Sequence, residues 1–135
     1  MTSLPAVERD DASAAFFDAA AHGELLIKQD AQSGTFLAPE ARTDPSTGST
    51  DLQPYAAAGT GALVSWAVVH RAPLPALAAD VPYFSAIVEL TEGPWLMVRL
   101  VVSNPANLRI GTPVQVRFVP SGDGAGEIVP VFEPI

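Results

Sequence analysis

The chain has 135 residues, of which 48% are hydrophobic and 16% are charged, and its formal net charge is -8. This composition provides enough apolar material for one domain-sized core, which excludes wholesale disorder. The excess of 15 acidic over 7 basic residues has the wrong sign for a nucleic-acid-binding domain, because phosphate contacts supply most of the affinity of such domains. Cysteine is absent, which excludes disulfides, thiolate metal sites and cysteine nucleophiles.

The same sequence gives no sign of membrane insertion or export. Its apolar runs are far shorter than a membrane span. The first residues, MTSLPAVERDD, become acidic before any apolar stretch, unlike a signal peptide. We therefore expect a cytoplasmic protein without membrane contact. The 13 prolines and 10 glycines favour many turns and short strands over a helical bundle.

One helix is predicted near the N-terminus, after a flexible arm over residues 1–9. The stretch DDASAAFFDAAAHG is rich in alanine, which favours helix. Asp10, Asp11 or Ser13 could cap its start, and Gly23 follows as a stop signal.

A turn-rich segment follows the short strand candidate ELLIKQ. From Asp30 to Thr50 the chain is rich in Ser, Thr, Gly, Pro and Asp and has no sustained period. The segment contains two similar frames, DAQSG starting at Asp30 and DPSTG starting at Asp44. Each frame has a polar residue, two spacers, a hydroxyl residue and a glycine. This is the outline of the paired knuckles of a zinc ribbon, without the cysteines.

From Ala62 onward the sequence predicts an all-β region. ALVSWAVVHR is a long β-type run, and YFSAIVEL alternates so that every second residue from Phe84 to Leu90 is apolar. WLMVRLVV, VQVRFVP and EIVPVFEPI follow after turn signals, the last as a proline-limited edge strand. Five strands joined by short turns favour a small barrel, because closure removes exposed sheet edges. The five-stranded oligonucleotide/oligosaccharide-binding (OB) barrel fits this count, with an SH3-like barrel or a small sandwich as structural alternatives.

The order of these segments resembles the family catalogued as domain of unknown function 35, which joins a zinc ribbon to an OB fold and is associated with acyl-CoA enzymes. The resemblance rests on FFDAAAHGELL, the two-knuckle segment, GTGALVSWAVVHR, VPYFSAIVELTEGPWLMVRLV and LRIGTPVQVRF, in this order. It covers the chain from about Phe16 to Phe132. It implies a mainly β protein with an N-terminal arm and helix over 1–23, a rubredoxin-like ribbon over 24–58 and an OB-fold domain over 59–135.

In that family the ribbon usually carries C-x-x-C-G twice. Laid onto this chain, the four cysteine positions fall at Asp30, Ser33, Asp44 and Thr47. Structural zinc sites use Cys or His ligands, and a carboxylate with a hydroxyl does not replace two thiolates. Calcium takes about six to eight oxygen ligands, for which two carboxylates are thin support. We therefore expect a degenerate ribbon without zinc or another cofactor, held by Asx- and ST-turns.

The resemblance also implies a partner. Family members commonly assemble with thiolase-superfamily enzymes, among them lipid-transfer-protein-like thiolases and aldolases of sterol side-chain breakdown, acyltransferases of phloroglucinol biosynthesis, and archaeal thiolase–synthase assemblies. The catalytic residues usually lie on the thiolase-like chain, while the small protein braces the complex and can border the acyl-CoA route. By this resemblance the chain is an accessory subunit without catalytic activity of its own.

The residues themselves give no sign of an independent active site. Ser65 and Ser85 lie on predicted strands without a nucleophile elbow, and the glycine-rich stretches match no phosphate-loop pattern. His22 ends the predicted helix, where a cation meets the negative end of the dipole. His70 and Arg71 end the long strand and could meet a CoA phosphate or an acidic partner surface, unless they form an ordinary solvated strand end.

Aromatic, methionine and arginine side chains indicate a candidate contact surface. Trp95, Met97 and Arg99 share the strand face opposite the aliphatic one, and these residue types are enriched at interface centres. The adjacent helix residues Phe16 and Phe17 could both meet the body of the domain, or one could face a partner. The proposed partner or CoA contacts are therefore Phe16, Phe17, His70, Arg71, Tyr83, Trp95, Met97 and Arg99, with no catalytic residue among them.

Two other functions remain open at this point. A single-stranded nucleic-acid-binding OB domain would need a basic groove with stacking aromatic residues, which the charge balance opposes. A small enzyme acting alone on acyl thioesters would need a nucleophile and a base, and the sequence offers no recognisable pair.

Overall fold

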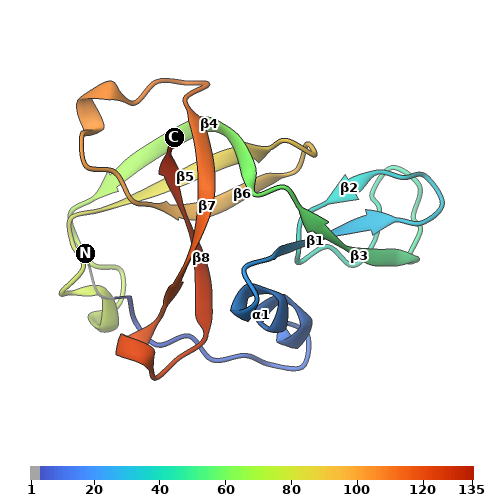
Figure 1. Cartoon of the computed structure of the whole chain (residues 1–135), viewed down its shortest axis with the longest axis horizontal. Helices are drawn as coiled ribbons and strands as arrows, with labels where there is room; N and C mark the ends of the chain where they lie inside the picture. Colours follow the sequence, from blue (N-terminus) through green and yellow to red (C-terminus); the bar gives the residue numbers. More distant parts are fainter. Residues whose placement is uncertain (1–3) are drawn as a thin grey trace.

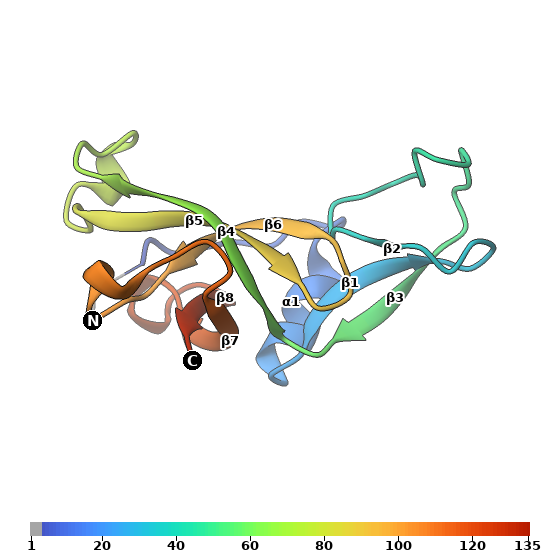
Figure 2. The ribbon, with the colours of Figure 1, turned by 90° about the horizontal axis from the view of Figure 1, so that it is seen from above.

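The computed structural model of the chain describes residues 4–135, so the first three residues of the expected arm lie outside it. The described residues form one α-helix, a three-stranded sheet and a five-stranded closed barrel (Figure 1). In both views the small sheet lies beyond one end of the barrel, with the helix between them (Figure 2). The elements in chain order are α1 (Ala14–Ala21), β1 (Leu25–Asp30), β2 (Phe36–Leu37), β3 (Leu52–Ala57), β4 (Thr60–Val69), β5 (Tyr83–Leu90), β6 (Trp95–Leu100), β7 (Pro113–Pro120) and β8 (Ile128–Pro134).

The barrel has the strand order β4-β5-β6-β8-β7 and confirms the predicted five-stranded OB barrel. Strands β4, β5 and β6 form an antiparallel meander, and β7 pairs with both β8 and β4. The barrel is closed by a parallel contact between β6 and β8, whose register is Leu100 opposite Phe132. The expectation that the last strand is an edge strand is wrong, because β8 lies between β6 and β7.

The apolar face predicted for β5 is the buried one. Ala86, Val88 and Leu90 are each at most 2% exposed, because they point into the barrel while the alternate residues point outward. Val114 of β7 and Phe132 of β8 complete the same core and are fully buried. The alternation predicted for β5 is therefore confirmed as an inward apolar face.

The three-stranded sheet contains a strand that the sequence pattern did not indicate. Strand β3 pairs with β1 over six residues, with Leu25 opposite Ala57 at one end and Asp30 opposite Leu52 at the other. Its alternation is weak because most of its side chains are exposed and Pro54 interrupts it. Leu25 and Ile27 of β1 are buried and join the barrel core, which ties the sheet to the barrel.

The helix is shorter than expected, since residues 11–13 form a turn before α1. Ser13 is the N-cap but makes no side-chain cap bond, and its hydroxyl donates to Asp10 Oδ1 at 2.7 Å instead. Gly23 ends the helix as predicted, with a φ of 77° that favours glycine.

The expectation of a flexible N-terminal arm is wrong for residues 4–9. The Val7 amide donates to the buried Ser121 hydroxyl at 3.0 Å, and the Val7 carbonyl accepts from Glu127 N at 2.8 Å. Arg9 forms an ion pair with Glu127 at 2.9 Å. The arm is therefore bound to the turn between β7 and β8.

The division into domains 1–23, 24–58 and 59–135 stays a prediction.

Phe132 provides a direct test of the barrel core. We expect Phe132→Ala to lower the free energy of unfolding by about 3–5 kcal/mol, because it removes a fully buried aromatic ring and leaves a cavity. Ile135→Ala is the matched control, since that side chain is 73% exposed and its loss should cost less than about 0.5 kcal/mol. Urea denaturation of the three proteins measures the difference, and equal midpoints would contradict the assigned core.

Candidate functional site

The first ribbon knuckle is held by hydrogen bonds around Asp30. The Asp30 side chain accepts from Gln32 N at 3.0 Å, and the Asp30 carbonyl accepts from Gly34 N at 2.8 Å. The Asp30 amide donates to Thr35 O at 2.9 Å. Gly34 has a φ of 78°, a conformation that residues with a Cβ rarely adopt. These bonds make a closed turn of the kind that a zinc knuckle forms around its metal.

The second knuckle repeats this pattern around Asp44. The Asp44 side chain accepts from Ser46 N at 2.9 Å, its carbonyl accepts from Gly48 N at 2.7 Å, and its amide donates to Ser49 O at 2.9 Å. Gly48 has a φ of 77°, nearly the value at the first knuckle. The segment therefore retains two equivalent knuckle turns, with backbone amides bonded to the aspartates.

The four former ligand positions converge between the knuckles. Asp30 and Asp44 are at most 1% exposed. Ser33 Oγ lies 3.0 Å from Asp30 Oδ2 and 3.1 Å from Asp44 Oδ2, so its proton can be donated to either carboxylate. Thr47 Oγ1 donates to Asp30 Oδ2 at 3.3 Å. Hydrogen bonds thus join the two knuckles at the positions where the family resemblance places the ribbon cysteines.

Hydrogen bonding favours the charged form of Asp30. The backbone amide of Gln32 is the main cause, and side-chain hydrogen bonds with Asp44, Ser33 and Ser49 add to it. Burial acts in the opposite direction, but the net effect lowers the pKa of Asp30 from 3.8 to about 2. Asp30 is therefore an ionised hydrogen-bond acceptor at neutral pH.

The residues between the knuckles do not fit the zinc of a cysteine ribbon. They offer two carboxylates and two neutral hydroxyls, whereas structural zinc is bound by thiolate and imidazole. Among residues 4–135, no three His, Cys, Asp or Glu side chains come together to hold a metal ion. That the ribbon contains no zinc stays a prediction, which elemental analysis of the purified protein would test.

The Asp30 carboxylate should make the stability of the ribbon depend on pH. Because its folded pKa of about 2 lies below the ordinary value of 3.8, its contribution is present above about pH 4 and is lost as the pH falls toward 2. Asp30→Asn should lower stability at neutral pH and remove this part of the acid dependence. Asp11→Asn, at an exposed position outside the knuckles, is the control. Denaturation midpoints from about pH 2 to pH 7 measure both, and an unchanged profile in Asp30→Asn would contradict the assignment.

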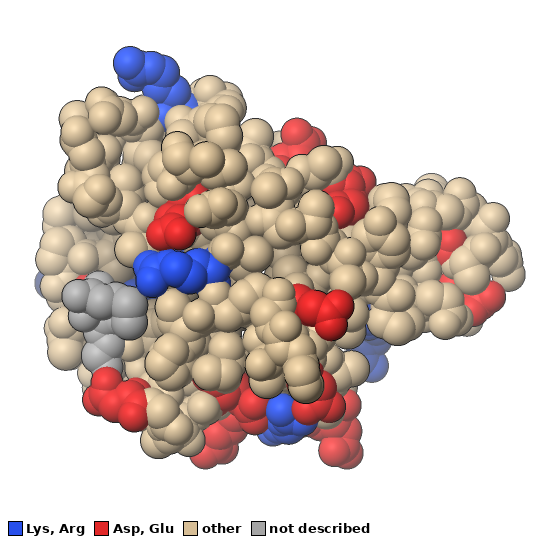
Figure 3. All heavy atoms as spheres, in the orientation of Figure 1, with Lys and Arg blue, Asp and Glu red and all other residues tan. Residues whose placement is uncertain are grey.

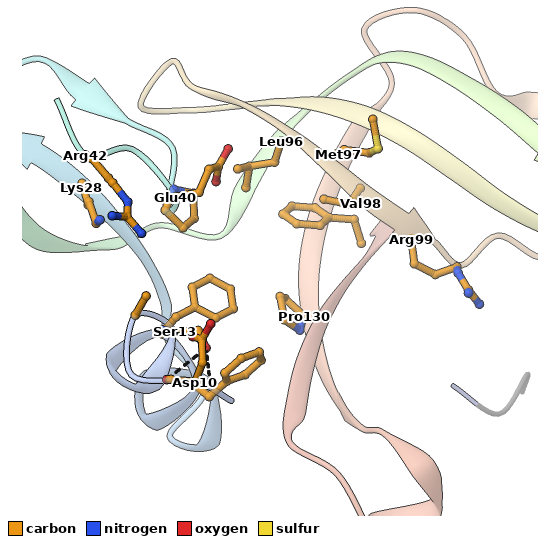
Figure 4. A pocket seen from close by; sticks show the side chains of 15 residues that line it. Asp10, Ser13, Lys28, Glu40, Arg42, Leu96, Met97, Val98, Arg99 and Pro130 are labelled. Atoms are coloured by element: carbon orange, nitrogen blue, oxygen red, sulfur yellow. Dashed lines mark hydrogen bonds between the residues drawn. The ribbon is translucent and has the colours of Figure 1, made fainter. Parts of the chain in front are cut away.

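A cavity of about 500 Å³ lies where the helix, the ribbon and the barrel meet (Figure 4). Phe16 and Phe17 enter it from α1, with their rings edge to face at a centroid distance of 5.3 Å. Four consecutive residues of β6, from Leu96 to Arg99, form another wall, and Pro130 of β8 a third. The structure therefore brings together four of the predicted contacts, which are Phe16, Phe17, Met97 and Arg99.

Basic residues lie at the ribbon end of this cavity. The Lys28 ammonium donates to the Ala41 carbonyl at 2.6 Å, which fixes its position. Arg42 is exposed and makes no hydrogen bond or ion pair with any of the residues described. Glu40 lies beside them in Figure 4. The sequence pattern did not indicate Lys28 or Arg42, because they become neighbours only when the ribbon folds back toward β6.

Arg99 also belongs to a second small cavity, of about 150 Å³, at the C-terminal end of β6. Its guanidinium lies 4.0 Å from the centroid of the Tyr83 ring and 3.9 Å from Asp80 Oδ2. Asp80 is 2% exposed, and its Oδ2 atom has no hydrogen-bond partner among the described residues. Two of the predicted contacts, Tyr83 and Arg99, are therefore neighbours. The Arg99 guanidinium, however, already contacts Tyr83 and Asp80 within the chain.

His70, Arg71 and Trp95 do not line either of these cavities. His70 and Arg71 do not end the strand as expected, since β4 stops at Val69, the last residue that pairs with β5. Both are exposed in the following loop. Trp95 and Met97 face outward from β6 and are 57% and 79% exposed. They form the largest exposed apolar surface on this strand.

Comparison with known proteins identifies the family. A sequence model of the ChsH2 C-terminal OB-fold domain matches residues 54–119. A solved structure described as the Ltp2-ChsH2(DUF35) aldolase contains a chain that is 38% identical, with a TM-score of 0.76, over 96% of this chain and 98% of that chain. The chain belongs to the DUF35 family. The DUF35 resemblance predicted from the order of sequence segments is thereby confirmed, with the four ribbon cysteines absent.

Two curated proteins extend this DUF35 relationship. A probable enoyl-CoA hydratase alpha subunit of Thermomonospora curvata is 38% identical over 130 residues, which are 96% of this chain but 39% of that protein. A DUF35 domain-containing scaffold protein of Pyrococcus furiosus is 29% identical over 91 residues, or 66% of its length. The chain thus spans about two fifths and two thirds of these relatives. A DUF35 protein of Sulfolobus solfataricus, 9% identical with a TM-score of 0.57, shares the fold.

The face of this DUF35 chain that is drawn in Figure 3 gives no support to nucleic-acid binding. On the face drawn in Figure 3, basic side chains are separate from one another, and acidic ones are spread over the barrel and the ribbon. A nucleic-acid site would require basic residues gathered along a groove.

Within residues 4–135, no helix has the length and apolar character needed to cross a membrane.

Proposed function

We propose that the chain is an accessory subunit of a thiolase-superfamily acyl-CoA enzyme, such as a lipid-transfer-protein-like thiolase, a side-chain aldolase or an acyltransferase. The observation that carries this proposal is the match to a chain of the Ltp2-ChsH2(DUF35) aldolase at 38% identity over nearly the full length of both chains. The scaffold description of the Pyrococcus relative agrees with a supporting role.

The proposed subunit has no catalytic activity alone. Among residues 4–135, the 500 Å³ cavity holds one hydroxyl paired with a carboxylate, Ser13 with Asp10, and this pair belongs to the turn before α1 with no histidine lining the cavity. The two histidines are both exposed and lie far apart in the sequence. The hydratase relative is more than twice as long as this chain, so its activity need not belong to the shared part. The reaction is therefore assigned to the partner.

A partner surface on β6 follows from the exposure of its side chains. Trp95 and Met97 remain more than half exposed, although aromatic residues and methionine are enriched at interface centres. The indole N–H of Trp95 donates to Glu89 at 3.1 Å, which holds the ring against the β5–β6 hairpin. A side chain fixed before binding loses less conformational entropy when a partner covers it.

Acyl-CoA at the shared interface is the finer part of the proposal. Lys28 and Arg42 provide two cations at the ribbon end of the cavity, and guanidinium groups suit phosphate. The neighbouring cavity wall between the Phe16 and Leu96 side chains is apolar. The bound molecule would thus place a phosphate at the ribbon and its apolar part toward the partner.

The localisation that we propose for the chain is the cytoplasm.

Complex formation is the first test of the proposed function. We expect co-expression with a thiolase-superfamily chain from the same genome, or with the Ltp2 subunit as reference partner, to give one heteromeric peak by size-exclusion chromatography. Separate peaks with every such chain would contradict the accessory role. Turnover of acyl thioesters by the purified chain alone would contradict the assignment of catalysis to the partner.

The Trp95 surface can be tested in that complex. Trp95→Ala should weaken the affinity by about tenfold or more, because a buried interface tryptophan commonly contributes about 2 kcal/mol. Ile110→Ala is the matched control, since Ile110 is 81% exposed on a loop away from β6. Isothermal titration calorimetry measures both variants, and an equal effect of the two would exclude Trp95 from the interface.

The cationic site can be tested with CoA itself. Arg42→Glu should weaken binding of CoA to the complex by about fivefold to tenfold, because it replaces a phosphate-binding cation with a repelling charge. Arg109→Glu is the control, at an exposed arginine outside the cavity. The effect should decrease as salt increases, since exposed charges are screened. Equal CoA affinity in the two variants would contradict a phosphate site at Arg42.

A further inference from the structure

Strand β6 has an edge without a partner strand. All six of its residues pair with β5, from Trp95 opposite Glu89 to Leu100 opposite Phe84. On its other side, β6 pairs with β8 only at Leu100. The first half of β6 therefore diverges from β8, and the 500 Å³ cavity opens in the gap.

Two hydrogen bonds establish which backbone groups face this gap. Leu90 N donates to Pro94 O at 2.9 Å, so the even-numbered positions of β6 point their backbone groups toward β5. Val101 N donates to Phe132 O at 2.8 Å, so the odd-numbered positions face β8. The N–H and C=O groups of Trp95 and Met97 thus point into the gap. No loop carbonyl or side chain within residues 4–135 bonds to them.

Proline removes one of the backbone donors with which β8 could pair at these positions. Ile135 N donates to Pro113 O at 3.0 Å, so the odd-numbered residues of β8 face β7 and the even-numbered ones face β6. Pro130 is therefore the β8 residue beside the open part of β6, and it has no N–H to donate. On the β8 side the Met97 carbonyl thus has no donor at Pro130, whereas β6 keeps all of its backbone donors.

The open half of β6, from Trp95 to Met97, lacks proline and charged side chains, two of the features that protect edges. Proteins protect exposed edges with short strands, proline or charged side chains. In the small sheet, β2 has only two residues and β3 contains Pro54. The exposed residues beside the open half of β6 are instead Trp95 and Met97. An unprotected edge with apolar side chains is suited to pairing with another strand.

A second unpaired edge exists on β4, which pairs with β7 only from Thr60 to Ala62. An open edge alone is therefore not sufficient evidence of a binding site. What distinguishes β6 is the cavity beside it, whose opposite wall is formed by the Phe16 and Phe17 rings. These rings can accept apolar side chains from a segment that is bonded to β6.

We propose that the edge of β6 at Trp95 and Met97 binds an extended, apolar segment of the partner enzyme by β-strand addition. The inference deepens the proposed function, because it names the part of the partner that is recognised. Backbone donors and acceptors in a row are matched by another main chain, which is why the occupant is a polypeptide rather than an acyl chain. The alternating side chains of the segment would contact Phe16 and Phe17 on one face.

Proline substitution separates main-chain pairing from side-chain contact. Met97→Pro removes the N–H that faces the gap without removing a β5 hydrogen bond, whereas Met97→Ala keeps that N–H and removes only the side chain. We expect Met97→Pro to bind the partner at least about tenfold more weakly than Met97→Ala, since it loses a hydrogen bond and its ring obstructs the added strand. Calorimetry on the co-expressed partner chain, or on Ltp2, measures the affinities.

Val68→Pro is the matched control for proline itself. Val68 of β4 is opposite Phe84 of β5. Because the backbone groups of Phe84 face β6, this pair exchanges no hydrogen bonds, and the Val68 N–H faces the unpaired side of β4. This variant should fold and bind as the wild type does. Circular dichroism and thermal unfolding identify any proline variant that fails to fold. If Met97→Pro fails to fold, amide hydrogen exchange of the wild type is the test instead. The amides of Trp95 and Met97 should then become protected only in the complex.

The outcomes distinguish the two proposals. If the wild type forms no complex, the accessory function and the strand addition both fail. If the complex forms but Met97→Pro and Met97→Ala bind equally, or the two amides stay unprotected, strand addition is wrong and the accessory function stands. Dimerisation of the chain alone that Met97→Pro abolishes would assign the edge to a second copy and overturn the proposal.

Discussion

The contact between β6 and β8 controls most of the architecture. A single parallel register position, Leu100 opposite Phe132, closes the barrel, and Phe132 is fully buried there. The pairing does not extend beyond this position, and Pro130, the next β8 residue that faces β6, has no N–H with which to continue it. The gap between the two strands leaves the cavity into which α1 places Phe16 and Phe17. One narrow closure thus both completes the core and creates the surface that we assign to the partner.

The ribbon shows how a metal site can be replaced by hydrogen bonds. Cysteine ribbons obtain their stability from zinc–thiolate bonds, and their folding is coupled to metal binding. In this chain the two aspartates accept backbone amides within each knuckle, and Ser33 and Thr47 connect the knuckles. The knuckle turns are present, and we predict that their stability depends on carboxylate ionisation rather than on a metal ion.

Alternation and turn residues predicted the barrel strands well, because each strand has one face in the core and one in solvent. They failed where that condition does not hold. Strand β3 is exposed on most positions and contains Pro54, so its sequence carries little alternation. The arm over residues 4–9 looked unstructured because its partners, Ser121 and Glu127, are more than a hundred residues away. The candidate site combines four elements, so Lys28 and Arg42 gave no local signal.

The sequence by itself determined the OB barrel, the inward face of β5, the two knuckle turns and the loss of zinc ligands. Each of these depends on side-chain type at a short, regular spacing, which local sterics and hydrophobic burial convert directly into structure. Only the tertiary structure decided that β8 lies inside the barrel, that Pro130 stands beside β6 and that the Met97 backbone is unpaired. These features depend on register between distant strands, and that register is set by packing of the whole core.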